Sequence, residues 1–122
     1  MSNIKYNEEQ EAFELPYKLW DDTVTIRFYV EDEADIMNNI KDIAEKLSKL
    51  DGSRKQIAEL IINDGYCECD DIDAFAKALV ISNPYVDIDD GDIIVCFDVE
   101  TDEGYLNIEL FEDDFEITGW AN

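Results

Sequence analysis

The chain has 122 residues, a length typical of one domain with its own hydrophobic core. Hydrophobic residues make up 46% of it, which excludes a disordered acidic tail even though the formal net charge is −23 at pH 7. That charge opposes direct binding to nucleic acid or to an anionic membrane, because both depend on Lys and Arg. The composition favours a basic protein, or cations, as the partner.

The amino terminus and the cysteines indicate a compartment. The opening MSNIKYNEEQ lacks the apolar core of a signal peptide, and no apolar run is long enough to span a membrane. Cys67, Cys69 and Cys96 are odd in number, which suits a reducing environment better than a disulfide framework. We therefore expect a cytoplasmic protein.

The first strands are predicted after a polar segment. Residues 1–12 are polar and are expected to be loosely ordered, and residues 13–122 are expected to form a single domain. Apolar residues then alternate from Phe13 to Val30, the period of half-buried strands. A two-residue loop at Asp21-Asp22 would pair Leu19 with Val24 and form a hairpin.

Helical periodicity follows from about residue 33 to residue 79. The first predicted helix has its apolar residues at Ile36, Ile40, Ile43, Leu47 and Leu50. Gly52 ends it, and Ser53 begins a second helix with Gln56 completing a capping box. Asp70 or Asp71 is expected to cap a short third helix.

The carboxyl-terminal third returns to a period of two. Loops at Asp90-Gly91, Glu103-Gly104 and Asp113-Asp114 would pair apolar residues with apolar residues across every hairpin. The predicted fold is α+β: an N-terminal β-hairpin, three helices, and a C-terminal four-stranded antiparallel meander with the helices packed on one sheet face. In this register Phe97 faces inward and Asp98 faces outward.

The outward face of the predicted meander is the candidate binding surface. No basic residue follows Lys77, so every charge on this face is acidic. Large aromatic residues lie among the acids, a combination that indicates an interface with a basic protein. The predicted partner-binding residues are Asp98, Glu100, Tyr105, Glu109, Phe111, Glu116 and Trp120. A rival surface is made by the helices and the loop from Asp64 to Asp71, which carries its own acids at Glu68, Asp70 and Asp71.

Metal sites and catalysis find little support in the sequence. In VDIDDGDIIVCF, an EF-hand loop with its glycine at Gly91 would place Val86, Ile88 and Phe97 at ligand positions. Cys67 and Cys69 have only Cys96 as a further thiol and no histidine, so a structural zinc site lacks its usual ligands. No histidine is present to act as a catalytic base. We expect no catalytic residue, no metal site and no cofactor.

The layout from about Phe13 to Trp120, closed by LFEDDFEITGW, resembles immunity proteins of bacterial polymorphic toxin and contact-dependent growth inhibition systems. The resemblance implies a cognate toxin domain, commonly a basic nuclease, that the protein holds inactive in one tight complex. It assigns no functional residue.

The sequence therefore predicts a non-enzymatic immunity protein, monomeric before complex formation, that occludes the active site or substrate surface of a basic toxin domain. One alternative is a nucleic-acid mimic that inhibits a DNA-binding protein. Others are a small carboxylate-dependent metal-binding enzyme and a structural adaptor.

Overall fold

The computed structural model describes residues 4–121 as one seven-stranded sheet and four helices. The strands are β1 (Lys5–Asn7), β2 (Ala12–Leu19), β3 (Asp22–Phe28), β4 (Val80–Asp89), β5 (Asp92–Thr101), β6 (Gly104–Phe111) and β7 (Asp114–Trp120). The helices are α1 (Glu33–Met37), α2 (Ile40–Asp51), α3 (Arg54–Asn63) and α4 (Ile72–Ala78).

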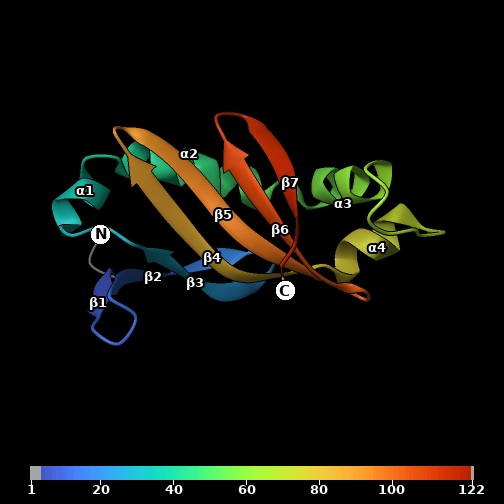
Figure 1. Ribbon diagram of the computed structural model, residues 1–122, viewed down its shortest axis with the longest axis horizontal. Coiled ribbons are helices and arrows are strands. Elements are labelled where there is room, and N and C mark those ends of the chain that lie inside the picture. Colours follow the sequence, from blue (N-terminus) through green and yellow to red (C-terminus); the bar gives the residue numbers. More distant parts are fainter. Residues whose placement is uncertain (1–3, 122) are drawn as a thin grey trace.

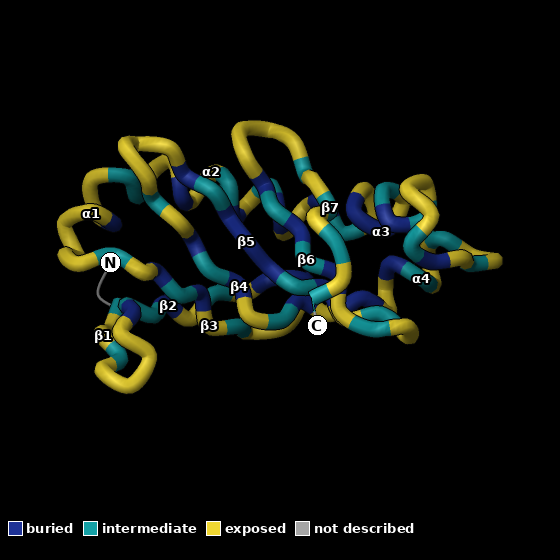
Figure 2. The backbone as a smooth tube through the Cα atoms, viewed as in Figure 1, coloured by how far each residue is buried: buried dark blue, intermediate teal, exposed yellow. Residues whose placement is uncertain are grey.

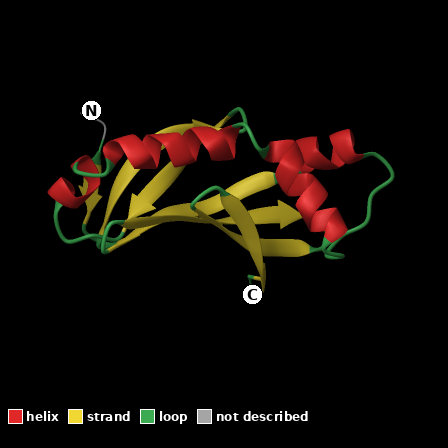
Figure 3. Cartoon of the chain, turned by 90° about the horizontal axis from the view of Figure 1, so that it is seen from above, coloured by secondary structure: helices red, strands yellow, loops and turns green. Residues whose placement is uncertain are grey.

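The strands lie side by side in chain order, from β1 to β7. Every neighbouring pair is antiparallel except β3 and β4, which run parallel and are joined by the four helices (Figure 1). A parallel pair needs such a crossover because its second strand must start at the same end as the first. The helices all lie on one side of the sheet, and the other side is open (Figure 3).

This arrangement corrects the predicted fold in three ways. The hairpin and the meander are not separate units, because Arg27 and Phe28 of β3 pair with Tyr85 and Val86 of β4 in a single mixed sheet. The segment expected to be loose contains β1, which pairs with β2, and residues 8–11 form the turn between them. Residues 1–3 of that segment lie outside the described residues. The third correction concerns the number of helices.

The first predicted helix is divided into α1 and α2 at Asn38 and Asn39. Asn39 has φ −117° and ψ 11°, which are not helical angles, and its side-chain amide donates to the carbonyl oxygen of Asp35 at 2.8 Å. Asn side chains bond the backbone in this way in competition with helical bonds. The apolar spacing does not reveal the break, because Ile36 and Ile40 lie on either side of it and are four residues apart, as in a continuous helix.

The caps of the later helices agree only partly with the prediction. Ser53 makes no capping bond, and its hydroxyl donates instead to the carbonyl oxygen of Lys49. The predicted capping box is therefore wrong. Asp71 does cap α4, because its carboxylate accepts the backbone N–H groups of Asp73 and Ala74.

Three of the four predicted hairpin loops are displaced by one residue, and only Asp90-Gly91 is right. The observed loops of these three hairpins are Trp20-Asp21, Asp102-Glu103 and Glu112-Asp113, so the pairings next to them are displaced by two residues from the prediction. Thr101 fixes the second loop, since its hydroxyl accepts from Glu103 N–H and donates to the Gly104 carbonyl. A displacement by two leaves each side chain on its expected face.

The first loop is fixed by burial of Trp20. This residue has φ 53° and the next has φ 70°, a left-handed pair suited to a tight hairpin turn. The Trp20 ring is only 5% exposed, and its Nε1–H donates to the carbonyl oxygen of Leu50 at 2.9 Å. Its backbone N–H donates to the carboxylate of Asp51 at 2.7 Å. These contacts with the end of α2 offset the strain of a left-handed tryptophan.

The core is formed by buried side chains of both the strands and the helices, and Figure 2 shows β5 as a largely buried strand. Val95, Phe97, Ile108 and Leu110 are fully buried, which confirms that their side chains face the helices. Ile117 is only half-buried, because β7 is the last strand of the sheet and one of its sides has no neighbour. In the described part of the chain, no helix has the length and apolar character that crossing a membrane requires.

Candidate protein-binding face

The open side of β4–β7 forms what we call the acidic face. Its side chains alternate with those that point to the helices. The face consists of Val80, Ser82, Tyr85, Asp87, Asp89, Asp92, Ile94, Cys96, Asp98, Glu100, Tyr105, Asn107, Glu109, Phe111, Asp114, Glu116 and Thr118. None of these residues is basic, and the acids come from all four strands.

The structure brings six of the seven predicted binding residues together on this face. They are Asp98, Glu100, Tyr105, Glu109, Phe111 and Glu116. Glu109 and Glu116 are direct partners across β6 and β7, so two like charges lie opposite each other. Such a pair is destabilising by itself. The face therefore holds negative charge that its own strands do not neutralise.

Trp120 is the exception, because a bulge turns it to the other side of the sheet. The β6–β7 register changes between Asn107 and Ile108, leaving Thr118 as an extra residue in β7. Trp120 then pairs with the inward-facing Leu106, and its ring meets that of Tyr66 edge to face at 5.9 Å between centroids. Its predicted place on the outward face of the meander is therefore wrong. Gly119, with φ 140°, is the sequence signal of the bulge that parity counting missed.

Hydrogen bonds orient several polar groups of the face. The Tyr105 hydroxyl donates to Glu100 at 3.0 Å, and the Asn107 side-chain amide donates to Asp98 at 3.0 Å. The Thr118 hydroxyl in turn donates to the side-chain oxygen of Asn107. The bond to Glu100, and the negative charge of that carboxylate, raise the pKa of Tyr105 above its usual value. These hydrogen bonds hold the carboxylates of Asp98 and Glu100 in place.

Phe111 and Ile94 supply the apolar part of the face. Phe111 is 43% exposed although it is a large aromatic side chain. Together with Ile94 it contributes to a shallow hollow of about 400 Å³ whose other lining residues are Glu109, Glu112, Asp114 and Glu116. An apolar floor with an acidic rim fits the long, cationic side chain of Lys or Arg. Ile94 is not among the predicted partner-binding residues.

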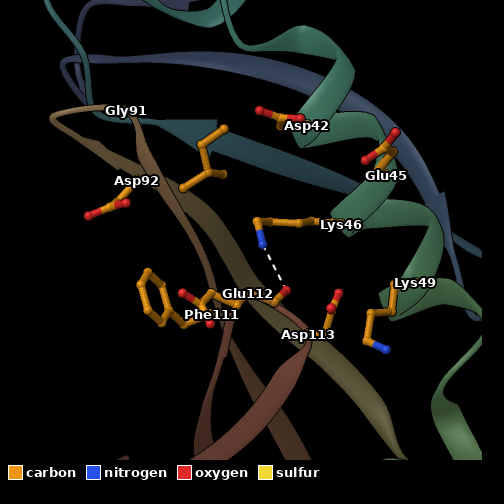
Figure 4. Close-up of a pocket in the computed structure, with 10 residues that line it drawn as sticks. Asp42, Glu45, Lys46, Lys49, Gly91, Asp92, Phe111, Glu112 and Asp113 are labelled. Carbon is orange, nitrogen blue, oxygen red and sulfur yellow. Dashed lines mark hydrogen bonds between the residues drawn. The ribbon is translucent and has the colours of Figure 1, made fainter.

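A second hollow lies at the same corner, on the helix side. It measures about 250 Å³ and separates α2 from the β4–β5 and β6–β7 turns. Lys46 extends from α2 across it, and its Nζ donates to the carbonyl oxygen of Glu112 at 2.8 Å (Figure 4). In the same view the Phe111 ring points away from α2. The hydrogen bond thus anchors the β6–β7 turn to α2, and the Phe111 side chain lies on the acidic face.

Within the acidic face, Cys96 is buried and Tyr85 beside it is half-buried. They are direct partners across β4 and β5, and Cys96 is only 4% exposed. A hydrogen bond with the Cys96 thiol, together with partial burial, raises the pKa of Tyr85 to about 12. Tyr29 meets Tyr85 edge to face at 5.6 Å, so an aromatic pair closes this end of the face. Sequence analysis missed Tyr29, because the contact depends on the β3–β4 pairing.

The rival surface lies where the α3–α4 loop approaches the β5–β6 turn. A hollow of about 430 Å³ is lined there by Gly65, Tyr66, Cys67, Glu68, Phe75, Asp102 and Glu103. Trp120 borders it through Tyr66. Burial raises the pKa of the Cys67 thiol, which makes it a poor nucleophile. Like the acidic face, this surface contains acidic and aromatic residues, but it is built from a loop, a short helix and a turn.

Possible metal ligands do not converge in the described structure. Among residues 4–121, no group of three or more Cys, Asp or Glu side chains lies in a position to hold one metal ion.

Comparisons of the chain with models of protein families, with curated proteins and with solved structures found no match.

Proposed function

We propose that the chain is a cytoplasmic immunity protein that binds a basic bacterial toxin domain through the acidic face and keeps the toxin inactive. The observation that carries the proposal is the open side of β4–β7, which holds acids on every strand and no cation. Helices cover the other side of the same strands (Figure 3). A folded domain that leaves this charge uncovered is suited to a partner of opposite charge.

The composition of the face fits this role in two respects. Its carboxylates would accelerate the encounter with a basic surface and take the place of nucleic-acid phosphates there. Phe111 and Tyr105, which are 43% and 40% exposed, would supply the apolar contacts that slow dissociation. Charge and anchors lie on rigid strands, so little ordering is required on binding.

The test uses the protein encoded directly upstream of this chain in its genome. Its carboxyl-terminal domain is expressed in a bacterial host, with and without the chain, and growth and complex formation are measured. We expect growth to stop without the chain and to continue with it. Absence of a toxic domain at that locus, or growth arrest despite the chain, would contradict the proposal.

A matched pair of variants shows whether the acidic face is responsible. Asp98→Lys with Glu109→Lys reverses two charges on the face, and we expect it to abolish protection. Glu9→Lys with Glu31→Lys changes the net charge equally at two exposed positions elsewhere and should protect normally. Equal loss of protection by both pairs would mean that total charge, and not this face, governs binding.

A further inference from the structure

The acidic face ends at an open strand edge. β7 is the last strand in the sheet order, so within residues 4–121 no strand pairs with its outer side (Figure 1). In an antiparallel ladder, successive residues point their N–H and C=O groups alternately toward and away from the neighbour. The two-residue loop sets Phe111 opposite Asp114 as the bonded closing pair. The backbone groups of Phe115 and Ile117 therefore point outward.

The two edges of the sheet differ in how they are protected. At the other edge, β1 has only three residues and begins with Lys5, and short length and lysine both discourage pairing with another chain. β7 has seven residues and contains neither Lys nor Pro. Its bulge at Thr118 distorts only the carboxyl-terminal end. The stretch from Asp114 to Ile117 remains regular and can accept a further strand.

The side chains of this stretch specify what that strand would contain. Phe115 and Ile117 lie on the helix side and are only half-buried, so a neighbouring strand would cover them. Glu116 lies between them on the acidic face and is exposed. Side chains directly opposite in a sheet share a face. The complementary strand therefore carries basic residues at the positions that face Glu116 and apolar residues in between.

Charge excludes a second copy of the chain as the occupant. Two β7 strands paired with each other would bring the Asp114 and Glu116 carboxylates of both copies together. Like charges at paired positions destabilise a sheet, and each copy carries a formal charge of −23. An extended basic segment would instead place positive charges opposite these carboxylates, which stabilises the pairing.

We propose that β7 binds its partner by strand addition, taking up an extended segment in which basic and apolar residues alternate. The inference rests on the proposed function, because it names the element through which the basic partner would bind. Backbone hydrogen bonds to Phe115 and Ile117 would provide register, and Glu116 would select basic side chains.

Two capped peptides of identical composition test the proposal. One alternates Lys with Val, and the other has the same residues in two blocks, so total charge is equal and only the strand pattern differs. Binding is measured by NMR titration and by amide hydrogen exchange of the intact protein. We expect the alternating peptide to bind about tenfold more tightly, a difference of about 1.4 kcal/mol. The amides of Phe115 and Ile117 should exchange more slowly in its presence.

The outcomes separate this inference from the proposed function. Equal binding of the two peptides, or unchanged exchange at Phe115 and Ile117, overturns strand addition and leaves charge-driven binding by the face intact. Failure of both peptides to bind even at low salt overturns both proposals.

A variant pair adds a test of the outward N–H group. Ile117→Pro removes a donor that β6 does not use, and it should erase the preference for the alternating peptide. Ile117→Val keeps the donor and should retain the preference. Retention by both variants would contradict pairing at Ile117, and the exchange measurement on the unmodified protein decides the matter if the proline variant folds poorly.

Discussion

The two halves of the open sheet surface carry opposite charge patterns. On β1–β3 the open side holds Lys5, Lys18 and Arg27, and Arg27 forms an ion pair with Glu14 at 3.0 Å. On β4–β7 every charged residue on the same side is acidic. Both halves belong to one sheet, and the same helical layer lies on its other side (Figure 3). Basic residues are thus absent from the open side of β4–β7 but present on the open side of β1–β3.

This difference shows that core formation does not dictate the charge of the open side. Phe28 on β3 and Phe97 on β5 are both fully buried under the helices, so the two halves share one core. A strand needs apolar residues on its inner side and tolerates either sign of charge on its outer side. The acidity of β4–β7 is therefore a feature that folding alone does not require.

The largest expected effect tests whether the halves share one core. Phe28→Ala and Phe97→Ala should each lower the free energy of unfolding by about 3–5 kcal/mol, since each loses apolar burial and leaves a cavity. Urea denaturation of the two variants measures this. A loss below about 1 kcal/mol for either one would show that its half is packed more loosely than the structure indicates.

The next effect concerns partner binding and should appear in one half only. Phe111→Ala should weaken binding of the basic toxin domain by about 2 kcal/mol, mostly through faster dissociation, because it removes an apolar anchor. Tyr6→Ala removes an aromatic residue that is 51% exposed on β1 and should leave binding unchanged. Surface plasmon resonance gives both rates. Equal effects of the two substitutions would place the interface elsewhere.

A smaller effect should have opposite signs in the two halves. Glu116→Gln relieves repulsion from Glu109 directly across the strands and should raise stability by about 0.2–1 kcal/mol at low salt. Glu14→Gln loses the ion pair with Arg27 and should lower stability by up to about 1 kcal/mol. Thermal melts at low and moderate salt measure both, and salt should shrink both differences. The same sign for both variants would contradict the comparison.

The last effect, which appears only at high pH, is a pH dependence at the boundary of the two halves. The pKa of Tyr85 is raised to about 12 by Cys96 and by partial burial, so the folded state favours the neutral phenol. This contribution to stability is complete below the ordinary tyrosine value of 10.0 and is lost as the pH rises through about 12. Tyrosinate absorbance should show one late-titrating tyrosine, and Cys96→Ala should lower its pKa. An unchanged titration in that variant would exclude Cys96 as the cause.

The sheet face on which each strand side chain lies was the part of the fold that the sequence could predict. A period of two placed Phe97 inward and Glu100 outward even though most hairpin loops were misplaced, because a displacement by two residues preserves the faces. The loops themselves depended on distant contacts. Trp20 entered a turn because Leu50 and Asp51 receive its donors, and no local rule assigns a tryptophan to that position.

The remaining errors came from structural features that the periodicity of apolar residues does not reveal. The junction of β3 with β4 joins residues more than fifty positions apart, and only three-dimensional packing shows it. A single extra residue at Thr118 reversed the side on which Trp120 lies and removed it from the predicted site. The site residues before the bulge were placed correctly on one face because regular alternation continued through them.

The parallel junction of β3 and β4 also has a consequence for the order of folding. The strands of β4–β7 are joined by two-residue turns, so their contacts close short loops, whereas the β3–β4 contact closes a loop that contains all four helices. Chain entropy opposes long loops more than short ones, and non-local pairing slows folding. We expect the carboxyl-terminal hairpins to form in the rate-limiting transition state and the β3–β4 junction to form after it. Stopped-flow kinetics should then show that Phe97→Ala slows folding and Phe28→Ala mainly speeds unfolding.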